Sequence, residues 1–392
     1  MGFPVLDRRS LLKYASVSGL ASLATACLSQ NAPTTTTATS SPGVGQPAPT
    51  GQQQQTVTLK FQSAFSPQDV FHEMLVLWAK KVEELSGGRI KVDALPNNAV
   101  VPFTQLIDAV SAGTLDGGLG VPAYWFGKDR AMSLFGTGPA IGMDADMLLG
   151  WVHYGGGQAL YDELEQKKLK LNVQSYFFGP MPTQPLGWFK KEVTSPDDFK
   201  GLKYRTVGLS ADMMSEMGAS VQILAGGDIV PALQTGRIDA AEFNNPTSDK
   251  LLGFQDVSKV LMVQSYHQPM ECMEILFNKT KFDAMSAVDK AIFRYATMAQ
   301  SADFTWIFMD RNSKDLEEFK TKFNVKVIKT PKSILEAQLN AWDRIIAKET
   351  AVNPDFAKIL DSQKTWARRV GTLRAEIMVS QELATEHFFG KK

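Results

Sequence analysis

From about residue 56 onward, segments with strand-like spacing of hydrophobic residues alternate with segments that have helical spacing. The segment 56–63 has apolar residues at every second position, as a strand does, and 71–85 has them at helical spacing. The alternation returns at 89–95, a short helical pattern follows at 103–112, and the small-residue run LDGGLG at 115–120 favours a third strand. This β-α-β-α-β order predicts an α/β fold.

Two distant segments of the chain are similar to each other. LIDAVSAGTLDGG at 106–118 aligns without gaps with IVPALQTGRIDAA at 229–241, so that Gly113 matches Gly236. Each predicts a helix that ends at the glycine and turns into a strand of small residues, which would let a ligand approach the backbone closely. The offset is too long for a solenoid repeat, so the pattern indicates two similar lobes. From about residue 286 the pattern is mainly helical.

The beginning of the chain predicts export rather than folded structure. Paired arginines in DRRSLLKY at 7–14 precede a modest apolar run that ends at Cys27, which is typical of a twin-arginine signal over residues 1–27. ATAC at 24–27 also resembles a lipoprotein cleavage box, although Ala24 stands where leucine is usual. The protein is therefore expected outside the cytoplasm, either soluble or lipid-anchored through Cys27. Residues 28–56, rich in Thr, Ser, Pro and Gln, predict a flexible linker.

Composition and motifs exclude several functions. The chain has 41 basic residues (Lys and Arg) and 41 acidic residues (Asp and Glu), so it has no net positive charge that would favour binding to nucleic acid. Cys27 and Cys272 are the only cysteines, too few for a disulfide framework or a cysteine-rich zinc site. GxSxG, HExxH and CxxC motifs are missing, the four histidines are scattered, and Glu271 with Glu274 supports an acid–base pair only weakly. The sequence thus does not predict an enzyme.

The candidate site lies in the stretch 184–245. A strand-like KYRT contains Arg205, and the apolar run RIDAAEF brings Glu242 to the end of a second strand. A guanidinium matches both oxygens of a carboxylate, so Arg205 is interpreted as the residue that binds a small organic acid. The alternative interpretation is an arginine in a surface ion pair.

Four motifs in order resemble a known family. YWFGKDRAMSLF at 124–135, QPLGWFKKE at 184–192, DDFKGLKYR at 197–205 and ALQTGRIDAAEF at 232–243 are similar to the substrate-binding proteins of tripartite ATP-independent periplasmic (TRAP) transporters. The resemblance covers about residues 57–385 and is closest to the branch that binds 2-oxo acids and related monocarboxylates. It implies a two-lobed periplasmic-binding-protein fold with hinge strands, a location in the periplasm, and a membrane permease as partner.

The resemblance also implies roles for individual residues. Arg205 stands at the position of the arginine that binds the ligand carboxylate. Gln184, Glu242 and the carbonyl of Phe243 match the groups that hold a metal ion beside the ligand, and their oxygens suit Na⁺ or Ca²⁺. The alternative for Glu242 is a salt bridge with a lysine or arginine. Tyr124 is the candidate hydroxyl donor to a second ligand oxygen.

The expected lobes and helices have approximate boundaries. The C-terminal helices should brace the lobes and can form a homodimer. The first lobe is expected at 57–180 with a return at 270–310, the second at 181–268 with part of 311–345, and a helical extension at 346–392.

Departures from the family pattern concern the ligand. Phe243 replaces a frequent tryptophan, the segment 267–274 reads HQPMECME, and PMPT precedes Gln184. These changes predict a ligand larger or more polar than pyruvate, such as glutamate. We expect an extracytoplasmic receptor in which Arg205→Ala abolishes binding and leaves the fold intact. The alternatives are a metal-assisted enzyme built around Gln184 and Glu242, and a solute-sensing binding protein.

Overall fold

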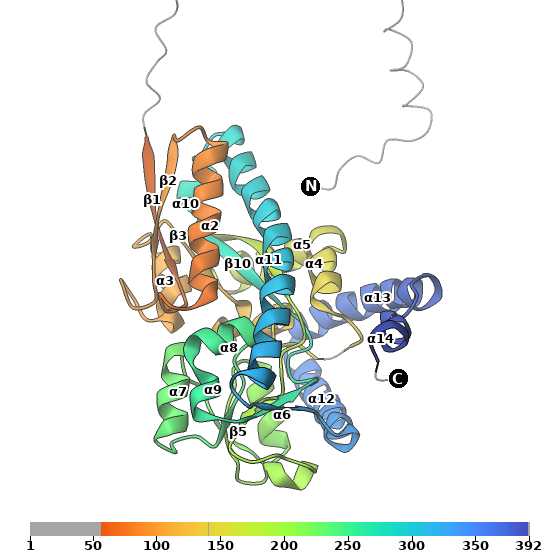
Figure 1. Cartoon of the computed structure of the whole chain (residues 1–392). Helices are drawn as coiled ribbons and strands as arrows, with labels where there is room; N and C mark the ends of the chain where they lie inside the picture. The colour runs from red at the N-terminus through yellow and green to blue at the C-terminus, as the bar shows by residue number, and fades with distance from the viewer. Residues whose placement is uncertain (1–55, 140, 391–392) are drawn as a thin grey trace, which may run out of the picture. The chain divides into compact units, whose positions relative to one another are not determined.

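The computed structural model describes residues 56–139 and 141–390. The expected export signal, Cys27 and the linker up to residue 55 lie outside the described residues. The predicted α/β fold is confirmed: the chain forms two sheets with helices around them (Figure 1).

The first sheet has the strand order β2-β1-β3-β10-β4. Strand β1 pairs in parallel with β2 and β3, whereas β10 runs antiparallel to β3 and β4. The sheet therefore combines an early β-α-β unit with two later, longer strands. Its strands are β1 (Val57–Ser63), β2 (Ile90–Leu95), β3 (Gly117–Gly120), β4 (Val173–Met181) and β10 (Glu271–Asn278).

The second sheet has the order β11-β9-β5-β8-β6-β7. Its strands are short; β8 has two residues, so the apolar run before Glu242 is a strand only at its end. Strands β6 and β8 are parallel, and Arg205 in β6 pairs with Ala241 in β8, which places Arg205 beside Glu242. The strands are β5 (Gly187–Phe189), β6 (Lys203–Arg205), β7 (Ser220–Gln222), β8 (Ala240–Ala241), β9 (Val260–Val263) and β11 (Lys326–Lys329).

Helices cover both sheets, and the C-terminal part is helical as predicted. Helix α11 packs against α2, β4 and α8, so it runs beside both sheets (Figure 1). The helices are α2 (Val70–Leu85), α3 (Leu106–Ser111), α4 (Ala145–Tyr154), α5 (Gly157–Asp162), α6 (Leu209–Glu216), α7 (Gly226–Gln234), α8 (Pro246–Leu252), α9 (Phe254–Val257), α10 (Lys279–Asp283), α11 (Ala287–Thr321), α12 (Lys332–Val352), α13 (Pro354–Ile377) and α14 (Gln381–Phe389).

The two similar segments have the same local geometry. After α3 and after α7 the chain turns at Gly113, with φ +80°, and at Gly236, with φ +73°. An aspartate follows each turn: Asp116 accepts a hydrogen bond from a lysine N–H of β1 at 2.6 Å, and Asp239 accepts one from a lysine N–H of β6 at 3.2 Å. The repeated sequence thus produces the same helix–turn–strand unit in both sheets.

The glycines of β3 serve packing rather than ligand access. A Cβ atom on Gly117 would overlap the Phe61 ring, and one on Gly120 would lie 2.8 Å from the Trp125 ring. Protein side chains therefore fill the space that was expected to admit a ligand. The lone described cysteine, Cys272, is buried in β10 with a free thiol.

Candidate ligand-binding site

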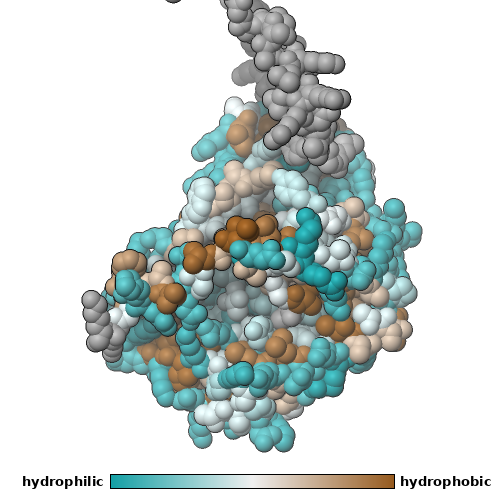
Figure 2. Space-filling model, turned by 90° about the vertical axis from the view of Figure 1, so that its right-hand side faces the viewer, coloured by the Kyte–Doolittle hydropathy of each residue, from teal (hydrophilic) through white to brown (hydrophobic). Residues whose placement is uncertain are grey.

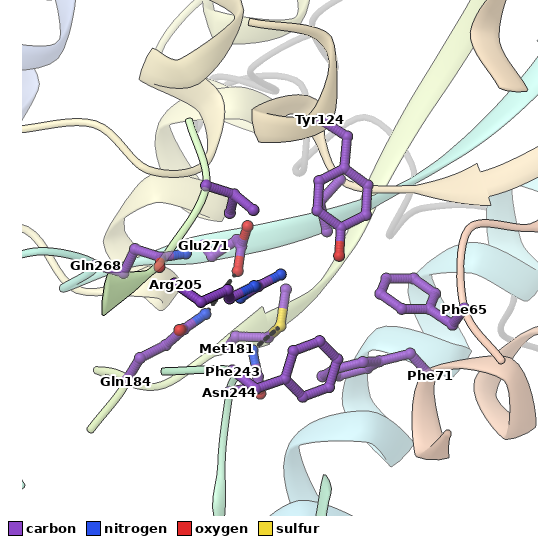
Figure 3. Close-up of a pocket in the computed structure, with 12 residues that line it drawn as sticks. Phe65, Phe71, Tyr124, Met181, Gln184, Arg205, Phe243, Asn244, Gln268 and Glu271 are labelled. Atoms are coloured by element: carbon purple, nitrogen blue, oxygen red, sulfur yellow. Dashed lines mark hydrogen bonds between the residues drawn. The ribbon is translucent and has the colours of Figure 1, made fainter. Parts of the chain in front are cut away.

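A small cavity lies between the two sheets, and residues from both line it (Figure 3). Its volume is about 20 Å³, which is room for about one water molecule between the side chains. The lining consists of aromatic and apolar side chains with a few buried polar groups: Phe65, Phe71, Val121, Tyr124, Met181, Gln184, Arg205, Val207, Phe243, Asn244, Gln268 and Glu271.

Arg205, at the end of β6, has an exposed fraction of 1%. Its Nε and Nη2 donate to the Leu224 carbonyl at 3.0 and 2.8 Å, and its Nη1 donates to the carbonyl and to Oε1 of Glu242 at 3.1 and 2.9 Å. A guanidinium has five N–H groups. Four make these bonds, so within the described residues one N–H of Nη2 is left for another acceptor.

Glu242 forms a buried ion pair with Arg205 and still has a free oxygen. Its Oε1 accepts from Arg205, whereas its buried Oε2 makes no hydrogen bond of good geometry among the described residues. Burial raises the pKa of Glu242 to about 7, and the charge of Arg205 acts in the opposite direction. The Thr206 hydroxyl lies near enough to this carboxylate to lower the pKa of Glu242 as well. An unpartnered buried carboxylate oxygen costs free energy, which a ligand or cation at this position would offset.

Gln184, between β4 and β5, also leaves an oxygen free. Its Nε2 donates to Glu271 Oε2 at 2.9 Å and its backbone N–H donates to the Gln268 carbonyl at 3.1 Å. The buried Oε1 has no partner among the described residues. Burial, followed by the nearby charge of Glu242, raises the pKa of Glu271 to about 8. Gln184 Oε1 and Glu242 Oε2 are thus two buried oxygens without a hydrogen-bond partner among the described residues, and oxygen is the donor type that a hard cation prefers.

Tyr124 and Phe243 are aromatic walls of the cavity. The Tyr124 hydroxyl points into it (Figure 3), and burial raises the pKa of this phenol, so it stays a donor at neutral pH. The Tyr124 ring packs against those of Phe65 and Phe103, at centroid distances of 6.0 and 4.9 Å. The Phe243 ring lies 5.5 Å from the Arg205 guanidinium carbon.

The structure brings the five predicted site residues together. Gln184, Arg205, Tyr124 and Phe243 line the cavity, and Glu242 binds Arg205 beside it. The surface ion pair considered for Arg205 is not observed, because the arginine is buried. The salt bridge considered for Glu242 is present, and its partner is Arg205 itself.

Glu271 and Gln268 were not predicted as site residues. Both come from the segment 264–271, where the chain passes from the second sheet back to the first, and its departure from the family pattern was the only available signal. Glu271 lines the cavity, whereas Glu274 accepts hydrogen bonds from Trp125 and from the Tyr161 hydroxyl at 2.9 Å elsewhere in the interior. The two carboxyl groups are therefore not an acid–base pair.

The described part of the chain shows neither a histidine-based metal site nor a membrane-spanning helix. Among the described residues no group of three or more His, Cys, Asp and Glu side chains could hold a metal. His267 is buried with Nδ1 2.7 Å from Ser265 Oγ, and burial lowers its pKa to about 3. In the same part of the chain, no helix has the length and apolar character to cross a membrane.

The two sheets, the passages of the chain between them, and the cavity between them with its few buried polar groups are the features of a two-lobed solute-binding protein. The family model described as bacterial extracellular solute-binding protein, family 7, matches residues 61–351, and the chain belongs to this family. It is 29% identical over 292 residues to a monocarboxylate 2-oxoacid-binding periplasmic protein of Nostoc sp., a match that covers 74% of this chain and 79% of that protein.

Two solved structures are similar over nearly their whole length. A TRAP transporter solute-binding protein from Bordetella bronchiseptica, a dimer with copurified calcium and picolinate, has a TM-score of 0.79 and 28% identity, covering 85% of this chain and 97% of that one. A TRAP periplasmic solute-binding protein from Pseudoalteromonas atlantica, with bound sodium and pyruvate, has a TM-score of 0.78 and 26% identity, covering 86% and 100%.

Proposed function

We propose that this protein is the extracytoplasmic solute receptor of a TRAP transporter and that it binds a small monocarboxylate, such as a 2-oxo acid. The remaining N–H of Arg205, buried next to the cavity, is the observation that carries the proposal. A ligand carboxylate would accept from it, and the Tyr124 hydroxyl would donate to a second ligand oxygen. A buried charge-assisted bond of this kind is stronger than one in water.

A cation beside the ligand is part of the proposal. Gln184 Oε1 and Glu242 Oε2 would hold it, together with the Phe243 carbonyl, and oxygen donors suit Na⁺ or Ca²⁺. The Glu242 carboxylate would then face Arg205 with one oxygen and the cation with the other. The cation would offset the negative charge that a carboxylate ligand adds to the Arg205–Glu242 pair.

Capture works by closure around the ligand. Tyr124 and Phe65 approach the cavity from the first sheet, and Arg205 and Phe243 approach from the second. A ligand that contacts both groups binds the closed form better than an open one, and this difference is what shifts the population to the closed state. The receptor then delivers the unchanged ligand to the membrane permease, so no catalytic residue is assigned.

The proposal places the protein in the periplasm. Its family consists of bacterial extracellular proteins, and the twin arginines in 7–14 support export by the twin-arginine route. Lipid attachment at Cys27, followed by the linker 28–56, would hold the receptor near its permease. A mass measurement on the exported protein distinguishes an intact, a cleaved and a lipidated N-terminus.

The C-terminal helices support a homodimer. Every described residue from Met378 onward is exposed, and α14 has no buried residue. Figure 2 shows hydrophobic residues exposed between hydrophilic ones on the face of the molecule toward which α13 and α14 project. Large apolar side chains exposed by more than half their surface at this end are Leu373, Ile377, Met378, Val379, Leu383, Phe388 and Phe389. Sedimentation of Leu383→Asp and Phe388→Asp should show loss of a dimer, whereas a monomeric parent protein would contradict this part.

The function is tested by calorimetric titration of the exported protein with pyruvate, lactate, glutamate and succinate, each with Na⁺, with Ca²⁺ or with a chelator. We expect stoichiometric binding of a monocarboxylate, recovery of that acid unchanged, and weaker binding after the cation is removed. Turnover of the acid would favour an enzyme instead. Failure of every carboxylate to bind would overturn the proposal.

A further inference from the structure

An ion pair outside the ligand cavity joins the two lobes. Arg130 Nη2 pairs with Asp212 Oδ2, and neither residue lines the cavity. Arg130 begins the short helix η3 (Arg130–Phe135), which follows β3 of the first sheet, whereas Asp212 lies in α6, between β6 and β7 of the second sheet. The contact therefore crosses from the lobe built on the first sheet to the lobe built on the second.

Each partner of this ion pair follows a proposed ligand-binding residue along the chain. Arg130 lies in the same motif as Tyr124, the segment 124–135, and Asp212 lies in the helix that directly follows β6 and Arg205. The first N–H of that helix also donates to Thr137 Oγ1 of the first lobe at 3.0 Å. A movement that separates Tyr124 from Arg205 therefore also separates Arg130 from Asp212.

A buried carboxylate holds Arg130 in place. The Nε of Arg130 lies 2.7 Å from Oε1 of Glu349, a side chain of α12 that is only 4% exposed. One helical turn later, Asn353 Nδ2 donates to Oδ1 of Asp129, the residue before Arg130, at 2.7 Å. A buried charge binds its partner strongly, because separation would leave it unpaired. Glu349 thus fixes one side of the guanidinium, and the side that faces Asp212 is free to lose its contact.

Ligand entry and release require the lobes to move apart. Arg205 is 1% exposed, and the cavity beside it has room for about one water molecule. A carboxylate therefore reaches or leaves Arg205 only when the lobes separate. This movement breaks the contact between η3 and α6, so the ion pair exists in the closed state and not in the open one.

We infer that the Arg130–Asp212 ion pair is a latch that stabilises the closed, ligand-bound state and slows ligand release. This inference rests on the proposed function and adds a determinant of affinity that does not contact the ligand. Its contribution is the same for every ligand, because it depends only on the difference between the open and closed states. The two side chains are 33% and 38% exposed, so the latch should strengthen binding roughly two- to fivefold.

The test measures dissociation constants and dissociation rates of pyruvate, lactate and glutamate for variants of Asp212. Asp212→Ala should weaken binding of each acid that the parent protein binds by a common factor of roughly two to five, mainly through faster dissociation. Asp212→Lys places two cations opposite each other and should weaken binding at least about tenfold. Asp212→Glu keeps the charge and should bind nearly as tightly as the parent protein.

Glu216→Lys is the matched control for Asp212→Lys. Glu216 lies one turn further along α6, is 41% exposed, and pairs at 2.9 Å with Arg344 of α12 instead of with the first lobe. Helices α6 and α12 pack against each other, so this pair stays within one lobe (Figure 1). Both variants make the same change in charge, and an added cation by itself favours a carboxylate ligand. Glu216→Lys should therefore bind at least as tightly as the parent protein.

The outcomes distinguish the latch from the proposed function. If Asp212→Ala and Asp212→Lys bind with the affinity of the parent protein, or if Glu216→Lys weakens binding as much as Asp212→Lys, the latch is overturned and the receptor function stands. A loss that differs strongly from one acid to another also overturns it, because the latch does not contact the ligand. If the parent protein binds no carboxylate, the proposed function is overturned and this inference falls with it.

Discussion

Arg205 Nη1 lies 2.9 Å from Glu242 Oε1, with both side chains almost fully buried. The parallel pairing of β6 with β8 fixes this distance, because it sets Arg205 opposite Ala241, the residue before Glu242. The pair has two effects that a surface ion pair would not have. It holds the guanidinium in one orientation at the cavity, and it makes each residue necessary for the stability of the other.

Replacing Arg205 should therefore affect both binding and folding. In Arg205→Ala the buried Glu242 loses its partner, and we expect a loss of about 3–5 kcal/mol in the free energy of unfolding together with loss of carboxylate binding. The expectation from sequence that this variant keeps an intact fold is revised, because Arg205 is buried in an ion pair with Glu242. Urea unfolding and ligand titration measure the two effects.

A double variant separates these two effects. Arg205→Leu combined with Glu242→Leu replaces the ion pair with apolar side chains and should recover most of the stability, without recovering binding. If the double variant binds a carboxylate with the affinity of the parent protein, Arg205 does not bind the ligand.

Local patterns predicted most of the elements and the region of the site. Periodicity located the early strands and helices, and the strand-like runs KYRT and RIDAAEF placed Arg205 and Glu242 at strand ends. That these two ends are neighbours follows only from the parallel pairing of β6 with β8. The position of Glu271 could not be predicted, because it depends on the antiparallel pairing of β10 with β4, where Glu271 lies opposite Met181. The role of the Leu224 carbonyl could not be predicted either, because every residue has a backbone carbonyl and the residue type therefore gives no signal.

Gln184 should determine the cation dependence of ligand binding. Its Oε1 is a proposed cation ligand, so Gln184→Ala should weaken binding at saturating cation and should make affinity nearly independent of chelator. Titrations of one carboxylate with and without chelator measure this dependence.

Gln268→Ala is the matched control for Gln184→Ala. Gln268 is also a buried glutamine of the cavity with an unpartnered Oε1, but it is not among the proposed cation ligands. Its variant should keep the effect of the chelator. An equal loss of cation dependence in both variants would mean that the cation site is assigned to the wrong residue.

Gly208, at the junction that follows β6, should not tolerate replacement by a residue with a side chain. Its φ of +59° disfavours other residues, and a Cβ atom would overlap Thr137 Oγ1, which accepts from the first N–H of α6 at 3.0 Å. Gly208→Ala should therefore lower the unfolding free energy by more than the roughly 1–3 kcal/mol that backbone strain alone costs.

Gly201→Ala isolates the contribution of strain. Gly201 has a similar φ of +73°, but no atom lies within 4 Å of the position of its Cβ. We expect a smaller loss, about 1–2 kcal/mol, for this variant, because only the left-handed backbone conformation opposes the alanine. Equal losses for the two alanine variants, measured by denaturant unfolding, would show that the contact with Thr137 is unimportant.

A buried acidic group in the first sheet should make stability depend on pH. Burial raises the pKa of Glu274 to about 7, against the hydrogen bonds from Trp125 and Tyr161. Burial also raises the pKa of Glu165, which accepts from Ser175 at 2.9 Å, and the charge of Glu274 raises it further. In the folded state both groups therefore bind protons more tightly than in the unfolded chain.

The sign of the pH effect follows from this preference. The stabilisation that comes from tighter proton binding in the folded state is complete below the ordinary carboxyl pKa. It is lost as the pH rises through the folded pKa of Glu274, which is about 7. We expect the melting temperature to fall between about pH 5 and pH 8. Glu274→Gln keeps a neutral side chain at all pH values and should show a smaller fall. A melting temperature that rises over this range, or an identical slope in the variant, would contradict the assignment to Glu274.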